Sequence, residues 1–263
     1  MHNIRLGNME IEALFALEES ESGVLTLADL EGRLQLSQEQ AWKLASRLVR
    51  KKRLIRLKRG VYLFAPMRAG RNGVWTEDAL AATPKLMAGK EYYIGFWSAL
   101  NHYGLTEQIP ITVQVVTLSR QRVIEALQTR FEFTQVRRLG EWQEEEIGGR
   151  RVRVATIEQL MMDCLSLPEK SGGVKEASKA LWNARKKLDW VKIETIASDS
   201  SDAARRRVGY LSELLGMRRL KPGTLIGWRW LDPSAPKREL GRSAKWGLIL
   251  NVPKKELLEW REH

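Results

Sequence analysis

The stretch KLASRLVRKKRLIRLKRGVYLFAPMRAGR, residues 43–71, decides the fold of the first part of the chain. It contains eleven Lys or Arg and no Asp or Glu. Its first half has helical periodicity, and its second half has two strand-like runs joined by Lys58-Arg59-Gly60. Basic charge gathered on one small element is typical of a phosphate binder. A helix followed by a hairpin with a basic tip indicates the last helix and the wing of a winged helix-turn-helix.

Two helices are expected before this stretch. Ile11, Leu14 and Phe15 recur at i, i+3 and i+4, which predicts a helix from about Asn8 to Glu19. A second helix is predicted to begin after Thr26, because Asp29 follows three residues later and completes a capping box.

The third helix is predicted to begin after Ser37, where Gln40 completes a second capping box. At about 100° per residue, its apolar residues fall on one side and its polar and basic residues on another. The side predicted to dock on the other helices contains Ala41, Leu44, Ala45 and Leu48. The residues expected to contact DNA as a recognition helix are Ser37, Gln38, Gln40, Lys43, Arg47 and Arg50.

The hairpin is predicted from Leu54–Leu57 and Val61–Phe64, with Gly60 supplying the positive φ of the turn. Arg56, Lys58 and Arg59 are expected to contact phosphates or a minor groove, which gives affinity but little sequence information. Two other interpretations are a solvated amphipathic helix and a winged helix that contacts only protein. A basic tip favours DNA.

The composition allows two units. The chain has 263 residues, 43% hydrophobic content and a net charge of +12. Residues 1–73 contain thirteen basic and eight acidic residues, and the rest contain 31 and 24, so DNA contact need not be confined to the first part. Turn residues in Pro66–Gly73 indicate a linker. We therefore expect a DNA-binding domain over residues 1–68, a linker over 69–75 and a second domain over 76–263.

The second part alternates helix-like and strand-like runs, so the predicted class is α+β: a winged helix-turn-helix followed by a mixed α/β domain. Its clearest strand is Ile111–Thr117, and Gly148-Gly149 predicts a hairpin. Later elements are expected as three helices and a strand, at Val174–Lys187, Trp190–Ala197, Ala203–Leu215 and Lys245–Val252.

Three blocks of this second part resemble the AbiEi antitoxin family. They are YYIGFWSALNHYGLTEQIPITVQVVT (residues 92–117), RRVRVATIEQLMMDCLSLPEKSGG (residues 150–173) and RRRVGYLSELLG (residues 205–216). The RGVY sequence of residues 59–62, at the end of the predicted winged helix, also resembles that family. The resemblance covers most of residues 25–216.

The resemblance implies a two-domain bacterial antitoxin linked to phage defence. In that family the first domain binds repeats in its own promoter and represses the operon. The second neutralises a nucleotidyltransferase-like toxin encoded beside it. Composition and periodicity by themselves support only DNA binding.

Catalytic and metal-binding patterns were sought and are not expected, and no cofactor is predicted. The single cysteine, Cys164, lies in an apolar run and is predicted to be a buried structural thiol. His102 lacks neighbouring ligands, and a structural role is expected. Asp163 is expected to be hydrogen-bonded or salt-bridged to an arginine, with Arg205–Arg207 the most plausible partner, because an unpaired buried carboxylate is costly.

A second basic cluster is a candidate surface for antitoxicity or nucleic acid. It contains Arg205, Arg206, Arg207, Arg218, Arg219 and Lys221. The tail that follows carries Trp228, Trp230 and Trp246 among basic residues. A packed hairpin is the favoured interpretation; the alternatives are base stacking and docking to an anionic protein surface.

The leading hypothesis is therefore a DNA-binding repressor that is also an antitoxin, with operator DNA and a toxin as partners. One alternative is a transcription factor whose second domain senses a ligand or oligomerises. An enzyme acting on nucleic acid is less favoured, because no paired carboxylates with a nearby Lys are evident. No signal peptide or membrane span is expected, so a cytoplasmic protein is predicted.

Overall fold

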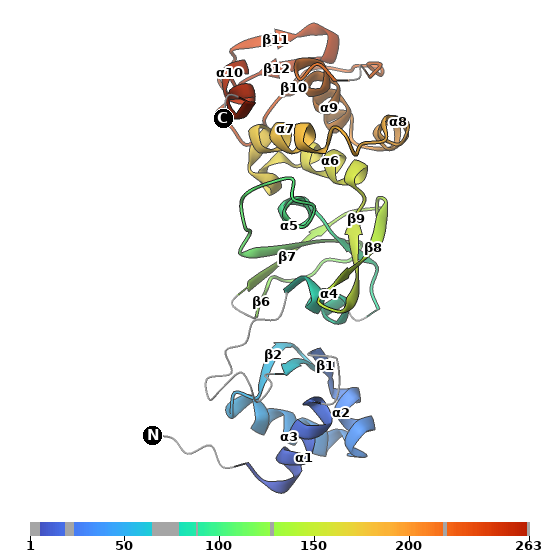
Figure 1. Cartoon of the computed structure of the whole chain (residues 1–263), viewed down its shortest axis with the longest axis vertical. Helices are drawn as coiled ribbons and strands as arrows, with labels where there is room; N and C mark the ends of the chain where they lie inside the picture. The colour runs from blue at the N-terminus through green and yellow to red at the C-terminus, as the bar shows by residue number, and fades with distance from the viewer. Residues whose placement is uncertain are drawn as a thin grey trace.

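The computed structural model describes residues 6–18, 24–64, 79–87, 89–126, 129–217 and 220–261. The predicted linker and the basic residues Arg68, Arg71, Arg218 and Arg219 lie outside these ranges, as does the side chain of Lys58. Figure 1 shows a column of layers, with the N-terminal unit (residues 6–64) at one end and a C-terminal unit (residues 79–261) above it. Helices and sheets both contribute, so the predicted α+β class is confirmed.

The N-terminal unit contains three helices and a three-stranded antiparallel sheet of order β1-β3-β2. Its elements are α1 (Asn8–Glu18), β1 (Val24–Thr26), α2 (Leu27–Leu34), α3 (Gln38–Arg50), β2 (Leu54–Lys58) and β3 (Val61–Phe64). Both predicted capping boxes are present, at Thr26 and at Ser37. Gly60 has φ 73° in the turn between β2 and β3, as the hairpin requires.

The apolar stripe expected on α1 is wrong in part. Leu14 is buried, but Ile11 and Phe15 are 38% and 65% exposed. The buried face of α1 instead contains Glu10, Ala13, Leu14 and Leu17. Glu10, Ala13, Leu14 and Leu17 recur at the i, i+3, i+4 and i+7 spacing of a helix. The helix was therefore predicted correctly, but the face that it buries was not.

The C-terminal unit is built around a six-stranded mixed sheet of order β6-β7-β5-β4-β9-β8. Its strands are β4 (Tyr92–Ile94), β5 (Thr112–Thr117), β6 (Ile124–Ala126), β7 (Thr129–Gln135), β8 (Trp142–Ile147) and β9 (Arg150–Ala155). The helices are α4 (Ala79–Met87), α5 (Phe96–His102), α6 (Ile157–Ser166), α7 (Gly173–Ala184), α8 (Trp190–Asp199), α9 (Asp202–Leu214) and α10 (Lys254–Leu258).

A second, small sheet of order β10-β12-β11 lies beyond α9 at the far end of the column (Figure 1). Its strands are β10 (Arg229–Trp230), β11 (Gly241–Ser243) and β12 (Leu248–Leu250). The strand expected over residues 245–252 was too long, because Ala244–Trp246 forms a 3-10 turn. Trp246 is 1% exposed, and a Cβ on Gly209 of α9 would lie 2.1 Å from its ring. The glycine therefore lets this tryptophan pack onto the helix. For Trp246, the interpretation that the tryptophans of the tail are packed is confirmed.

The two units share a buried boundary. All four side chains of β3 are buried, whereas a sheet with one solvent-facing side buries only alternate residues. Tyr62 and Phe64 pack with the apolar side chains of the N-terminal helices. Val61 and Leu63 belong to the apolar cluster of the C-terminal unit. In Figure 1 the β-sheet of the N-terminal unit faces α4 and β6 accordingly.

The carboxylate of Asp163 on α6 has partners other than those expected. Asp163 accepts hydrogen bonds from the Tyr93 hydroxyl at 2.8 Å and from the Gln159 amide at 2.7 Å. The expected pairing with the Arg205–Arg207 triplet is therefore wrong. Cys164 is fully buried, as predicted, and burial raises the pKa of its thiol. Among the described residues, no helix has the length and apolar composition needed to cross a bilayer.

Candidate nucleic-acid interface

Helix α3 is divided into two faces, as its sequence predicts. Ala41, Leu44, Ala45 and Leu48 are all 0% exposed and hold the helix on the rest of the N-terminal unit. Lys43 and Arg50 are exposed. The helix can therefore be held by its own unit on one side while its other side meets a duplex.

The polar side of α3 is partly occupied by local bonds. Lys43 forms an ion pair with Glu39 one turn earlier, at 2.6 Å, with both side chains mostly exposed. Gln40 is exposed, but its amide oxygen accepts the Ser37 backbone N–H at 2.9 Å. An exposed ion pair at this i,i+4 spacing contributes about 0.3–0.5 kcal/mol, so a phosphate or a base edge can replace Glu39 as the partner of Lys43 at little cost.

Arg47 lies on the flank of α3 that faces α1, away from the centre of the exposed face. Its Nε is 3.6 Å from Oε1 of Glu10. Lys51 binds the other carboxylate oxygen of Glu10, Oε2, at 2.5 Å. The Glu10 side chain is only 5% exposed, whereas that of Arg47 is 43% exposed. This flank thus contributes to holding α1 on α3, a role that helical periodicity alone did not reveal.

The wing places two further cations beside α3. Arg56 on β2 and Arg59 at the turn are both exposed. Together with Gln38, Glu39 and Trp42 of α3, they line a groove of about 420 Å³. The structure therefore brings Arg56 and Arg59, two of the three predicted wing residues, close to the start of α3. Arg53, from the same basic run, is 5% exposed and does not extend this surface.

Trp42 was missed by the sequence analysis. It is 57% exposed on the groove side of α3. The helical angle carries the signal, because Trp42 falls outside the stripe formed by Ala41, Leu44, Ala45 and Leu48. An exposed aromatic side chain flanked by arginines offers apolar contact to a base or a sugar.

Residues 12–65 match the family model described as "Transcriptional regulator, AbiEi antitoxin". The matched stretch runs from α1 through β3 and therefore contains α3 and the β2–β3 hairpin. It confirms, for this part of the chain, the family resemblance found in the sequence. The N-terminal unit is thus of the kind found in that family of transcriptional regulators. No curated protein matches the chain.

A solved structure has the same fold over nearly the whole chain. The crystal structure of the RV2827C protein from Mycobacterium tuberculosis superposes with a TM-score of 0.72. The match covers 99% of this chain and 97% of that one, at 14% sequence identity. The likeness extends beyond the AbiEi-like stretch to the C-terminal unit, and at this identity it concerns the fold alone.

Two of the four described residues of the second predicted basic cluster are buried. Arg206 and Arg207 are 1% and 4% exposed, so the expectation that they form a surface is wrong. Arg206 binds Asp202 at 2.8 Å and the carbonyl oxygen of Gly227 at 2.7 Å. Arg207 donates to the carbonyl oxygen of Leu165 at 2.7 Å. Their guanidinium groups tie α9 to surrounding backbone and are not available to a partner.

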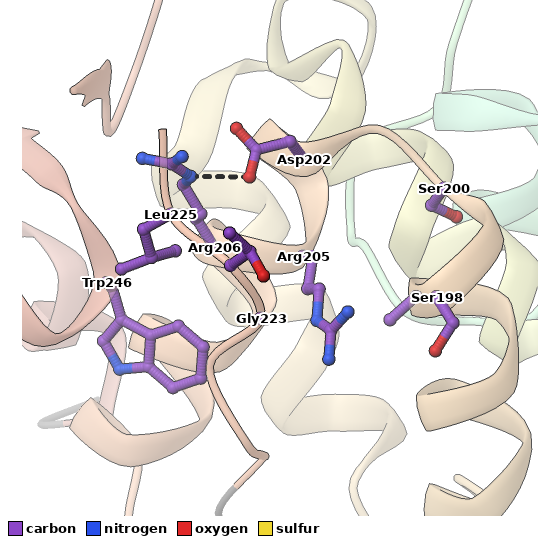
Figure 2. Close-up of a pocket in the computed structure, with 10 residues that line it drawn as sticks. Ser198, Ser200, Asp202, Arg205, Arg206, Gly223, Leu225 and Trp246 are labelled. Atoms are coloured by element: carbon purple, nitrogen blue, oxygen red, sulfur yellow. Dashed lines mark hydrogen bonds and ion pairs between the residues drawn. The ribbon is translucent and has the colours of Figure 1, made fainter. Parts of the chain in front are cut away.

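Arg205 differs from its two neighbours. Figure 2 shows it extending beside Gly223, whereas Arg206 bonds to Asp202. A Cβ on Gly223 would lie 2.9 Å from the Arg205 guanidinium. Arg205 also contributes, with Lys221, to a smaller pocket of about 220 Å³. Of the described members of the predicted cluster, these two are the ones not buried.

The ion pairs of Glu10 with Arg47 and Lys51 allow a test of how α1 is held against α3. Desolvation raises the pKa of Glu10, but the hydrogen bonds from Lys51 and the Gly7 N–H and the charges of Lys51 and Arg47 hold it below its ordinary value. A carboxylate whose pKa is lowered by folding stabilises the protein at pH values above the pKa it has in the unfolded chain. This stabilisation is lost as the pH falls through the pKa of the folded state.

We expect Glu10→Gln to lower the free energy of unfolding at pH 7 by about 1 kcal/mol, modest because the two cations remain partly solvated. The difference from the wild type should shrink as the pH falls below about 4, close to the ordinary pKa of a solvated glutamate. Urea denaturation over this pH range measures both effects. Exposed Glu12→Gln on the same helix is the control and should be neutral. An equal loss at pH 3 and pH 7 would refute the ion-pair explanation.

Proposed function

We propose that this protein is a transcriptional repressor that binds operator repeats of its own operon through α3 and the wing. The observation that carries the proposal is the groove between α3 and the wing, which Arg56 and Arg59 flank. The outer face of α3 supplies groups for base edges, since Lys and Arg pair with guanine and Gln with adenine. The wing supplies cations for phosphates, which set the affinity and its salt dependence.

The roles of individual residues follow from their places. Lys43 and Arg50, exposed on α3, are assigned to the major groove, together with Gln38 and Gln40. Ser37 acts mainly as the helix cap, because its hydroxyl accepts the Gln40 backbone N–H. Arg47 is assigned a supporting role, since it lies against Glu10. Arg56, Lys58 and Arg59 are assigned to the DNA backbone.

We further propose that the chain is an antitoxin in a bacterial phage-defence system and that its partner is a nucleotidyltransferase-like toxin. The support is the family match of residues 12–65 and the three family-like sequence blocks over residues 92–216. The C-terminal unit is the part assigned to neutralisation. Because Arg206 and Arg207 are buried, any basic contact surface near α9 is expected to use Arg205 and Lys221.

DNA binding is tested by a mobility-shift titration with the DNA upstream of the gene. Lys43→Ala and Arg50→Ala should each weaken operator binding about tenfold to a hundredfold and relax its sequence preference, the cost of losing a base contact. Arg59→Ala should weaken binding to all sequences and reduce the slope of log affinity against log salt by about 1.

Exposed Lys192→Ala on α8 is the matched control, because it removes the same charge from the C-terminal unit. Its affinity for the operator should equal that of the wild type. Unchanged affinity in all three N-terminal variants would refute the assignment of the interface.

Neutralisation is tested by co-expression of the full-length chain with the nucleotidyltransferase-like protein encoded beside it. The wild type should restore growth. The Lys43→Ala, Arg50→Ala double variant should also restore growth when both genes are under foreign promoters, because its C-terminal unit is intact. Failure of the wild type to restore growth would contradict the antitoxin proposal and leave the repressor proposal standing.

A further inference from the structure

A cavity of about 740 Å³ lies in the C-terminal unit, away from α3 and the wing. Its walls come from β4, from the loop of residues 136–141 between β7 and β8, and from α6, α8 and the turn before α9. The volume falls in the range of about 300–1,000 Å³ that is typical of sites for small molecules.

One side of the cavity carries a carboxylate held at a fixed position. Asp163 is partly exposed to the cavity, and its two oxygens accept hydrogen bonds from Tyr93 and Gln159 at 2.8 and 2.7 Å. Each oxygen has a further lone pair. Desolvation raises the pKa of Asp163 to about 6, against the lowering effect of the two hydrogen bonds. At neutral pH the group is thus mainly an acceptor for a donor on a ligand.

The same cluster positions the loop of residues 136–141. The side-chain oxygen of Gln159 accepts the Glu141 backbone N–H at 3.2 Å. A Cβ on Gly140 would lie 2.1 Å from Gln159, so the loop packs directly on this amide. The loop is therefore held against α6 by a partly buried hydrogen bond and by the close packing of Gly140 on Gln159.

Two arginines of this loop, Arg137 and Arg138, line the cavity and are exposed. Arg138 forms an ion pair with Asp199 of α8 at 3.1 Å, with both side chains mostly exposed. Within the described part of the chain, Arg137 has no ion pair. Exposed pairs contribute about 0–1 kcal/mol, so an anionic ligand can replace Asp199 at little cost.

The remaining walls combine apolar and hydroxyl groups. Ser166 of α6 and Ser201 before α9 share a hydrogen bond of 3.0 Å at the cavity. The apolar lining consists of Val136, Leu139, Met162 and Ile196. A ligand that satisfies all these groups has an anionic end, a flat or apolar body and an N–H donor.

We propose that the cavity binds a nucleoside phosphate. Arg137 and Arg138 bind the phosphate, the apolar walls contact the base and ribose, and Asp163 accepts an N–H from the base. A sugar phosphate alone provides the anion without the apolar body or the N–H donor. The proposal adds a small-molecule site to the C-terminal unit and is independent of the function proposed above.

The test is calorimetric titration of the full-length protein with the four nucleoside 5′-monophosphates and with ribose 5-phosphate. At least one nucleotide should bind with a Kd below about 1 mM, and at least tenfold more tightly than ribose 5-phosphate. The Arg137→Ala, Arg138→Ala double variant should weaken that binding at least tenfold, because both phosphate contacts are removed.

Arg151→Ala is the matched control, because Arg151 is 85% exposed on β9 and does not line the cavity. It should bind the nucleotide as the wild type does. Both variants replace exposed side chains, and their thermal unfolding verifies that they fold. Absence of binding by any nucleotide, binding unchanged in the double variant, or an equal loss in Arg151→Ala would each overturn the proposal. Operator binding by the double variant should be unchanged, which separates this site from the DNA interface.

Discussion

The burial of β3 on both faces is the constraint on which the rest of the structure depends. Tyr62 and Phe64 complete the apolar core beneath α3, while Val61 and Leu63 pack into the C-terminal unit. Full burial of an aliphatic or aromatic side chain contributes about 1.5–3 kcal/mol. The strand is thus held on both sides, and it in turn holds the hairpin whose turn is formed by Arg59 and Gly60. The same hairpin forms one side of the groove between α3 and the wing.

Local signals in the sequence predicted the N-terminal unit well. Both capping boxes, the buried stripe of α3 and the turn at Gly60 depend on residues within a few positions of one another, so spacing and angle suffice to find them. The hairpin at Gly148-Gly149 was predictable for the same reason. Element type and most boundaries therefore followed from short-range physical chemistry.

Contacts between residues far apart in the chain could not be predicted from the sequence. Arg47 lies against Glu10, 37 positions earlier, and Asp163 receives its hydroxyl donor from Tyr93, 70 positions earlier. Arg206 and Arg207 are buried because backbone carbonyl oxygens from distant segments surround them. A count of charges treats every arginine as a surface group, and only the folded arrangement separates structural arginines from those free to bind a partner. The short strands β6, β10 and β11 were missed because two or three residues carry too little periodicity.

The central claim is that the outer face of α3 meets the operator, and site-specific cross-linking tests it most directly. The only cysteine, Cys164, is fully buried, so a new surface cysteine can be labelled selectively with a photocross-linker. A label at Glu39→Cys, in the groove between α3 and the wing, should cross-link to operator DNA. A label at Glu256→Cys on α10 should not. Cross-linking from position 256 with none from position 39 would contradict the account.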